Sequence, residues 1–202
     1  MKNSKSGVSK AEFLTRVGIL TAVGTIMYLF LPEIPIMVGH LKFDISDLPA
    51  MIAGLTTGPA AGAAVIIIKN IFHLLKSTTM GIGEVVNILV GCTMIFTLCG
   101  VYNLTKRLRK SEKIYDHFSY FIACIVTIAV TVGTGFLYNL ALTPVFLMAV
   151  GSEVTASAVV GFAASSVALN LVKSIANTVL VYPVFIALRP FVIQKEKKLI
   201  KT

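Results

Sequence analysis

Five long stretches of the chain contain almost no charged side chains, and this feature limits the possible folds more than any other. Residues 17–32, 48–68, 85–105 and 118–152 lack Asp, Glu, Lys and Arg, and residues 154–188 carry only Lys173. A helix needs about 20 apolar residues to cross a bilayer. Of the 202 residues, 56% are hydrophobic and 13% charged, whereas soluble domains have about 25% charged residues. The sequence therefore indicates a membrane protein that crosses the bilayer several times, and it excludes a soluble enzyme or nucleic-acid-binding protein.

The apolar runs and the breakers between them predict an all-α bundle of six helices, forming one integral membrane domain over residues 1–202. The first run is typical of an anchor helix, because no small-residue cleavage site of a signal peptide follows it. Pro144 is expected to end the fifth helix. The second helix would rise only about 16 Å and must pack in the bundle or line a cavity. The expected helices are residues 11–31, 47–57, 60–76, 83–108, 117–140 and 163–188.

Basic residues are unevenly distributed between the expected loops. Most of the 18 Lys and Arg residues fall near 2–16, 106–113 and 189–201. Because cytoplasmic loops are enriched in Lys and Arg, both termini are expected in the cytoplasm. These basic groups would contact anionic lipid, or some of them would dock a partner. Five acidic residues then lie on the outer side: Glu33, Asp44, Asp47, Glu84 and Glu153.

Polar side chains inside the last apolar run share one helical face. Ser166, Asn170, Lys173 and Asn177 recur at helical spacing. A lysine near the middle of a span costs about 2.5–3.5 kcal/mol on insertion scales. An internal ion pair with Glu84 would explain it, as would helix–helix hydrogen bonds of the asparagines. We favour a face turned toward a ligand, because two amides and an ammonium group converge there.

Other polar groups are expected at the same depth, in the outer half of the bilayer. Together they predict a cavity open to the outside, suited to a flat amphipathic molecule with several hydrogen-bonding groups. The loop over residues 32–46 is long enough to cover it. The threonines of the fifth helix could instead form hydrogen bonds to neighbouring helices. The groups are Thr127, Thr131, Thr134, Tyr138 and Asn139 on the fifth helix, Glu84 and Asn87 on the fourth, and Lys69 and His73 on the third.

The sequence contains no pattern of a catalytic or metal site. The three cysteines lie in apolar helices without the spacing of metal ligands, and the three histidines are scattered. No phosphate-binding loop is present, so the chain cannot itself drive transport with ATP. Gly18-x-x-x-Ala22 on the first helix allows close helix packing, either within the bundle or against a partner membrane subunit.

Several segments together resemble the substrate-binding (S) components of energy-coupling factor (ECF) transporters, nearest the riboflavin-specific RibU type. They are residues 41–49 (LKFDISDLP), Gly58-Pro59, Ile68-Lys69-Asn70, Asn139 and Asn170-x-x-Lys173. The resemblance covers nearly the whole chain. It implies a vitamin-capturing protein of the bacterial cell membrane that is not an enzyme. A transmembrane coupling subunit and two cytoplasmic ATPases would supply the energy. Many S components carry Ala-x-x-x-Ala on the first helix to contact that subunit, and here Gly18 and Ala22 take those positions.

The resemblance also implies roles for individual residues. Asn139, Asn170 and Lys173 would hydrogen-bond the isoalloxazine or ribityl groups of riboflavin, a bound substrate rather than a cofactor. Phe136 and Tyr138 would pack against the ring. Three other readings stay open: an S component for another vitamin such as pantothenate, a stand-alone facilitator, and an intramembrane enzyme, although the apolar runs contain no paired acids, His cluster or Ser/His pair for the last. The remaining expected ligand-binding residues are Lys42, Phe43 and Asp44 of the loop, and Asn87.

Overall fold

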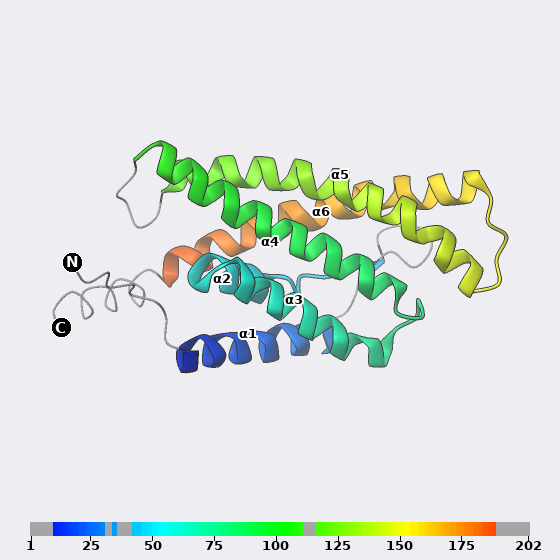
Figure 1. Cartoon of the computed structure of the whole chain (residues 1–202), viewed down its shortest axis with the longest axis horizontal. Coiled ribbons are helices and arrows are strands. Elements are labelled where there is room, and N and C mark those ends of the chain that lie inside the picture. Colours follow the sequence, from blue (N-terminus) through cyan, green and yellow to red (C-terminus); the bar gives the residue numbers. More distant parts are fainter. Residues whose placement is uncertain (1–9, 31–33, 36–41, 111–115, 189–202) are drawn as a thin grey trace.

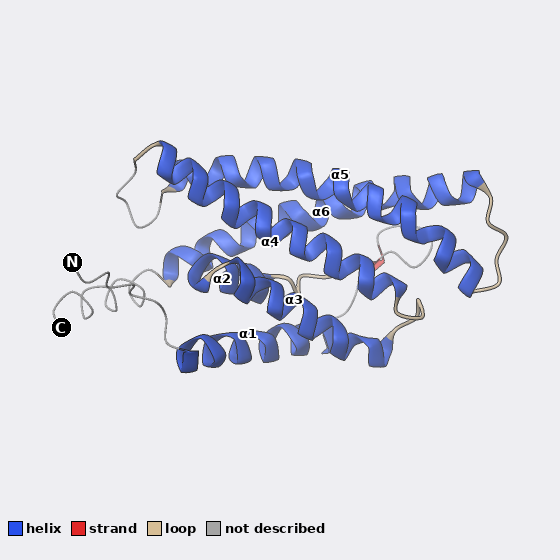
Figure 2. Ribbon diagram, in the orientation of Figure 1, coloured by secondary structure: helices blue, strands red, loops and turns tan. Residues whose placement is uncertain are grey.

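The computed structural model describes residues 10–30, 34–35, 42–110 and 116–188. Six α-helices dominate this part of the chain, and one pair of two-residue strands joins antiparallel beside them (Figures 1 and 2). The elements are α1 (Lys10–Phe30), β1 (Ile34–Pro35), β2 (Lys42–Phe43), α2 (Leu48–Thr57), α3 (Pro59–His73), the 3-10 turn η1 (Leu74–Lys76), α4 (Ile82–Leu108), α5 (His117–Ala149) and α6 (Ala156–Ala187).

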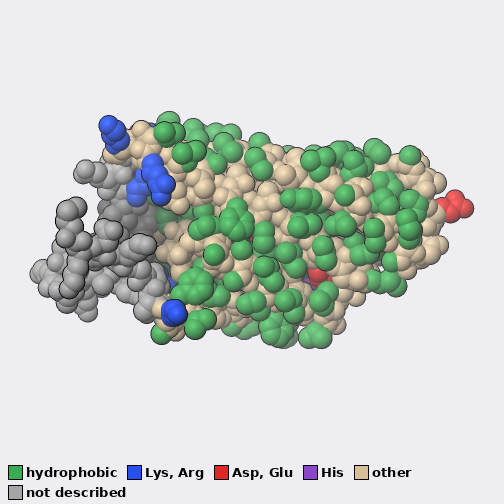
Figure 3. All heavy atoms as spheres, viewed as in Figure 1, with side chains coloured by type: hydrophobic (Ala, Val, Ile, Leu, Met, Phe, Trp, Pro, Cys, Tyr) green, Lys and Arg blue, Asp and Glu red, His purple; other side chains and the backbone are tan. Residues whose placement is uncertain are grey.

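Five of these helices are long and apolar enough to cross a membrane, and α2 is the short exception. In Figure 1, α4, α5 and α6 run side by side, and α1, α2 and α3 form the other half of the bundle. Apolar side chains are spread over the outer surface (Figure 3), as expected of a surface that meets lipid acyl chains. The buried core includes Met51, Ile66, Met94, Leu98 and Val181.

The break between α2 and α3 sets the position of the loop before α2. Gly58 has φ +124°, a conformation that favours glycine, and Pro59 opens α3. Gly62 then lies so close to α2 that a Cβ atom would come 2.7 Å from the Ala50 carbonyl oxygen. The start of α2 is buried, since Asp47 and Ala50 are both 0% exposed. This short helix therefore brings the acidic residues before it into the bundle.

Two helices extend beyond their expected bounds. The fifth was expected to end near residue 140, but α5 continues through Pro144 to Ala149. Proline is tolerated in membrane helices when neighbouring groups replace the lost hydrogen bond. The sixth was expected from residue 163, but α6 begins at Ala156, where the Thr155 side chain accepts a hydrogen bond from Ala158 N (3.3 Å). Both extensions lengthen the walls at one end of the bundle.

The two ends of the bundle differ in charge (Figure 3). We call the end where α1 begins and α4 meets α5 the basic end, because its exposed side chains include Lys10, Arg107, Arg109 and Lys110. Here Arg109 donates two 3.0 Å hydrogen bonds to Asp116, which caps α5. We call the opposite end, where α3 meets α4 and α5 meets α6, the cavity end.

Candidate ligand-binding site

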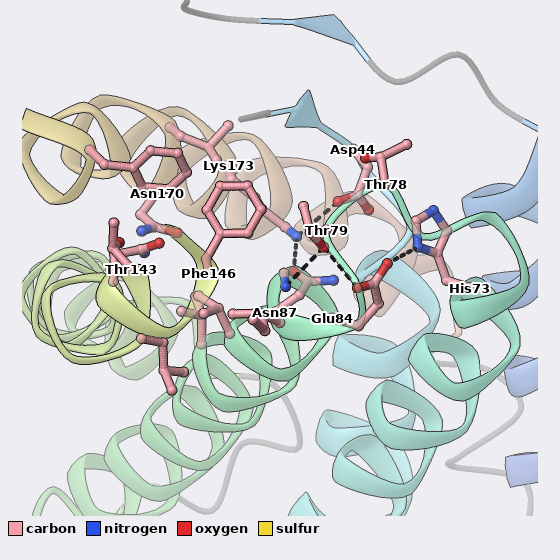
Figure 4. A pocket seen from close by; sticks show the side chains of 18 of the residues that line it. Asp44, His73, Thr78, Thr79, Glu84, Asn87, Thr143, Phe146, Asn170 and Lys173 are labelled. Carbon is pink, nitrogen blue, oxygen red and sulfur yellow. Dashed lines mark hydrogen bonds and ion pairs between the residues drawn. The ribbon is translucent and has the colours of Figure 1, made fainter. Parts of the chain in front are cut away.

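A cavity of about 130 Å³ lies at the cavity end, and α4, α5 and α6 contribute most of its wall. It combines charged, amide and hydroxyl groups with apolar surface, the mixture that binds amphipathic small molecules. Its apolar lining includes Val90, Leu142, Phe146, Phe162 and Leu169. Its main polar lining residues are Asp44, His73, Glu84, Asn87, Asn139, Asn170 and Lys173 (Figure 4).

Lys173 stands at the centre of the polar lining, and it is 6% exposed. Its ammonium group donates to the Asp44 carboxylate (2.9 Å) and to the side-chain amide oxygen of Asn87 (2.7 Å). It also forms an ion pair with Asp47 at 2.9 Å. An internal pair with Glu84 was one alternative for this lysine, but its partners are the two aspartates before α2. The ion pairs offset the cost of burying the charge, and Lys173 still borders the cavity.

A second lysine completes the charged cluster behind the cavity wall. Lys69 of α3 is fully buried and donates to Asp47 and to Ser46 Oγ, both at 2.5 Å. Its ammonium group also lies 4.6 Å from the Tyr28 ring centroid. Ser46 Oγ in turn donates to Asp44. Two lysines and two aspartates balance in charge, so the cluster can stay buried.

Asp44 connects the loop to this cluster. Burial would raise the pKa of its carboxyl group. The ammonium groups of Lys173 and Lys69 and the hydrogen bonds from Ser46 and Lys173 outweigh burial, and the pKa falls well below its ordinary value. Asp44 is therefore ionised at neutral pH, and its charge holds the loop end against α6.

The α5–α6 side of the cavity carries the amides. Asn139 donates to the Gly135 carbonyl oxygen one turn earlier (2.8 Å). Asn170 is 5% exposed, lines the cavity, and its side-chain amide makes no hydrogen bond within the described part of the chain. The buried Thr143 hydroxyl likewise has no partner among the described residues. Buried polar groups are rarely left unpaired, and these two side chains turn unused hydrogen-bonding groups toward the cavity that they line.

The α3–α4 side carries a second polar group, centred on Glu84. Its carboxylate contacts His73 Nδ1 (3.0 Å) and accepts hydrogen bonds from Ser77 (2.9 Å) and Thr79 (3.1 Å). The His73 ring stacks on Tyr28, with centroids 3.7 Å apart. Figure 4 shows Glu84 and His73 across the cavity from Asn170 and Thr143, with Lys173 and Asn87 between the two groups.

The structure brings five of the expected ligand-binding residues together. Asp44, Asn87, Asn139, Asn170 and Lys173 all line the cavity.

Phe136 and Tyr138 do not line the cavity; Tyr138 Oη lies 3.1 Å from Thr93 Oγ1 on α4 instead. Phe146, Phe162 and Tyr28 of α1 supply the aromatic lining, and the two phenylalanines lie in the parts of α5 and α6 beyond the expected bounds. Lys42 and Phe43 form β2, but their side chains lie outside the described part of the chain, as does most of the loop expected to cover the cavity.

Ser46 and Asp47 were not assigned to the site from sequence. Lys69 was expected among the polar groups of the cavity, but it does not line the cavity and instead belongs to the charged cluster behind its wall. The sequence did contain a pattern that could have indicated this cluster. Asp44 and Asp47 flank Ser46 directly before a short helix, and Lys69 follows within an apolar run. Gly18 and Ala22, the expected docking residues, lie on the exposed side of α1, and open space surrounds the Gly18 Cα. Among the described residues, no three His, Cys, Asp or Glu side chains are grouped as metal ligands would be.

Comparison with known proteins agrees with this architecture. Residues 12–195 match the family model described as ECF transporter, substrate-specific component. The riboflavin transporter FmnP of Bacillus subtilis (strain 168) is 27% identical over 191 residues, covering 92% of this chain and 96% of the relative. The riboflavin transporter RibU of Staphylococcus aureus (strain TCH60) is 30% identical over 107 residues, covering 53% of this chain and just over half (56%) of that relative.

A solved structure of the S component of a bacterial ECF transporter shares the fold. Its TM-score is 0.73 at 21% identity, and the match covers 91% of this chain and 98% of that one. The six-helix arrangement expected from the apolar runs is thus confirmed, as is the resemblance carried by the loop and helix motifs. The chain belongs to the family of substrate-specific components of ECF transporters.

Proposed function

We propose that this chain is the riboflavin-binding S component of an ECF-type importer. The observation that carries the proposal is the unpaired amide of Asn170, buried in a cavity beside Asn139 and Lys173. The pyrimidine edge of a flavin alternates carbonyl acceptors with an N–H donor. Amides can both donate and accept, and an ammonium group donates, so these side chains match that edge. The names of the two relatives support the same ligand.

Binding would enlarge the cavity. At about 130 Å³ it is smaller than the roughly 300–1,000 Å³ of typical ligand pockets. Lys173 would exchange its hydrogen bond to Asp44 or Asn87 for one to a ligand carbonyl. Releasing Asp44 would free the loop end to move outward, and Phe146 and Leu169 would contact the ring. The chain itself would bind and release its ligand without covalent chemistry, and is therefore not an enzyme.

The charge asymmetry supports an orientation in the membrane. The basic end would face the cytoplasm, following the bias of Lys and Arg toward cytoplasmic loops. The cavity would then open outward in the bacterial cell membrane, with both termini inside. A transmembrane coupling subunit would dock on the exposed face of α1 around Gly18 and Ala22, where small residues allow close approach. Two cytoplasmic ATPases would supply the energy.

A binding experiment tests the ligand. The protein is purified in detergent from riboflavin-depleted cells and titrated with riboflavin, pantothenate and thiamin. Quenching of flavin fluorescence reports riboflavin binding, and calorimetry reports the other two. We expect tight binding of riboflavin alone, weakened at least tenfold (about 1.4 kcal/mol) by Asn170→Ala and not by the surface variant Glu153→Gln. Tight binding of pantothenate without riboflavin would assign the chain to another vitamin. Equal riboflavin uptake by cells lacking the coupling subunit would favour a stand-alone facilitator.

A further inference from the structure

The connection between α4 and α5 gathers cations at the basic end of the bundle (Figure 3). Arg107, Arg109 and Lys110 are exposed, and Asp116 is the one acidic side chain that the structure describes in this connection. Arg109 binds Asp116 through Nη1 alone, so no described residue accepts a hydrogen bond from its Nε or Nη2. Arg107 and Lys110 form no ion pair within the described ranges. The described part of this connection therefore carries positive charge that it does not itself balance.

Lys110 holds its charge at a backbone position that usually takes glycine. α4 ends at Leu108, and Lys110 N then donates to the Arg107 carbonyl oxygen (3.0 Å) with Lys110 at φ +49°. A residue with a side chain is strained at this angle, and helices that end in this way generally place glycine there. Strained residues of this kind are concentrated at functional sites. The strain at Lys110 therefore indicates a use for a cation at this point of the surface.

Exposed apolar side chains adjoin the cations on the side toward the middle of the bundle. Leu104 and Leu108 lie one turn apart on α4, Phe118 and Phe121 lie at the start of α5, and all four are exposed. The guanidinium group of Arg109 stacks on the Phe118 ring at 4.3 Å, which holds the cation at the border between charged and apolar surface. The patch thus combines positive charge at the end of the bundle with apolar surface beside it.

A phospholipid with a net negative headgroup has the chemistry that matches both parts of the patch. Its phosphate accepts hydrogen bonds, and a guanidinium group can donate two parallel ones to it. Its acyl chains need apolar side chains beside the headgroup. A zwitterionic phospholipid would bring its own cation to a surface that is already positive. A free phosphate ion or an acidic peptide would use the cations and leave the apolar side chains uncovered.

We propose that Arg107, Arg109 and Lys110 bind the headgroup of an anionic phospholipid whose acyl chains lie along Leu104 and Phe121. Basic groups between membrane helices can bind such headgroups, and each cation near an anionic membrane surface adds to the attraction. The lipid site lies at the opposite end of the bundle from the cavity. Lipid selectivity and vitamin binding can therefore be measured separately, and either can fail without the other.

A tryptophan reporter tests the site, because the chain contains no tryptophan of its own. Leu108→Trp places the reporter in the patch, and Val145→Trp places it on exposed α5 surface at the cavity end. Each full-length protein is reconstituted into phosphatidylcholine vesicles with increasing fractions of brominated phosphatidylglycerol or brominated phosphatidylcholine. Bromine quenches tryptophan emission on contact. The measured quantity is the lipid selectivity, the ratio of the two brominated-lipid fractions that quench half of the emission.

We expect the Leu108→Trp protein to select phosphatidylglycerol about tenfold and the Val145→Trp protein to select neither lipid. In the Leu108→Trp protein, Arg107→Gln and Lys110→Gly should each lower the selectivity about threefold, and Lys110→Arg should preserve it. Lys110→Gly also relieves the backbone strain, so a weaker fold would not explain its loss. The matched control is Lys10→Gln, which removes an exposed cation of α1 at the same end.

Three outcomes would overturn the proposed lipid site. The first is equal quenching by both lipids in the Leu108→Trp protein. The second is a loss in Lys10→Gln as large as that in Lys110→Gly, which would mean that lipid responds to the overall charge of this end and not to a site. The third is loss of the selectivity in excess inorganic phosphate at constant ionic strength, which would assign the cations to a free phosphate ion.

Discussion

Gly135 of α5 lies directly against the side-chain amide of Asn170 on α6, so closely that a Cβ atom at position 135 would collide with the amide nitrogen. The antiparallel contact between α5 and α6 continues toward the basic end, where Tyr120 Oη of α5 donates to the Thr178 carbonyl oxygen of α6 (2.7 Å). The glycine thus leaves room for the amide at the cavity wall.

Gly135→Ala should displace the Asn170 amide and weaken riboflavin binding. Alanine favours a helix over glycine by about 1 kcal/mol, so the loss of binding would not come from a weaker α5. We expect the Kd to rise about tenfold, the cost of one lost hydrogen bond to a buried group. Gly133→Ala is the matched control, since a Cβ there meets nothing within 4 Å. Equal riboflavin affinities of the two variants would show that the contact with Gly135 does not position Asn170.

The contribution of Asp44 to stability should depend on pH. Its pKa is lower in the folded protein than the ordinary value of 3.8, so its contribution is fully present above that value. It is lost as pH falls below 3.8 toward the folded pKa. We compare thermal unfolding of the wild-type protein and Asp44→Asn in detergent from pH 7 to pH 3. The difference in Tm should stay constant down to about pH 5 and shrink below about pH 4. A difference that grows on acidification would contradict the ion pairs of Asp44.

Lys69→Met should destabilise the protein although Lys69 does not line the cavity. Removing one member of a buried ion pair leaves an uncompensated charge and costs about 3–5 kcal/mol. The free energy of unfolding is measured by denaturant titration in detergent. Lys69→Met combined with Asp47→Asn restores the charge balance, so the double variant should lose less stability than the two single changes added together. Strict additivity would mean that the two charges are not coupled.

Gly18→Leu should separate ligand capture from transport. The substitution places a large side chain on the exposed face of α1, far from the residues that line the cavity. Riboflavin affinity should not change. Uptake by cells and co-purification of the coupling subunit should fall about tenfold, as expected from about 1.4 kcal/mol of lost packing. Gly100→Leu on α4, where a Cβ also meets open space, is the matched control. Equal loss of uptake in both variants would place the docking surface elsewhere.

Part of the candidate site could be inferred from local pattern alone. The spacing of Asn170 and Lys173 places both on one face of a helix, and both line the cavity. The aromatic lining could not be inferred in the same way. Phe136 and Tyr138 are close in sequence to Asn139, but the helical rotation turns them away, and Phe146 two turns later takes the place expected for them. Its helix was expected to stop before it, because the effect of Pro144 depends on neighbouring helices that sequence does not show.

The long charge-free runs determined the membrane class, because a bilayer requires each span to satisfy its own backbone hydrogen bonds. Together with the Gly58-Pro59 break, which divides one run into two helices, they also determined the number of helices. They also required the polar residues inside those runs to face something other than lipid. The tertiary structure alone decided what they face. Lys173 meets Asp44 and Asp47 more than a hundred residues earlier in the chain, because α2 begins inside the bundle and carries both acids to α6. Pairing over such a separation depends on helix packing, which no local spacing encodes.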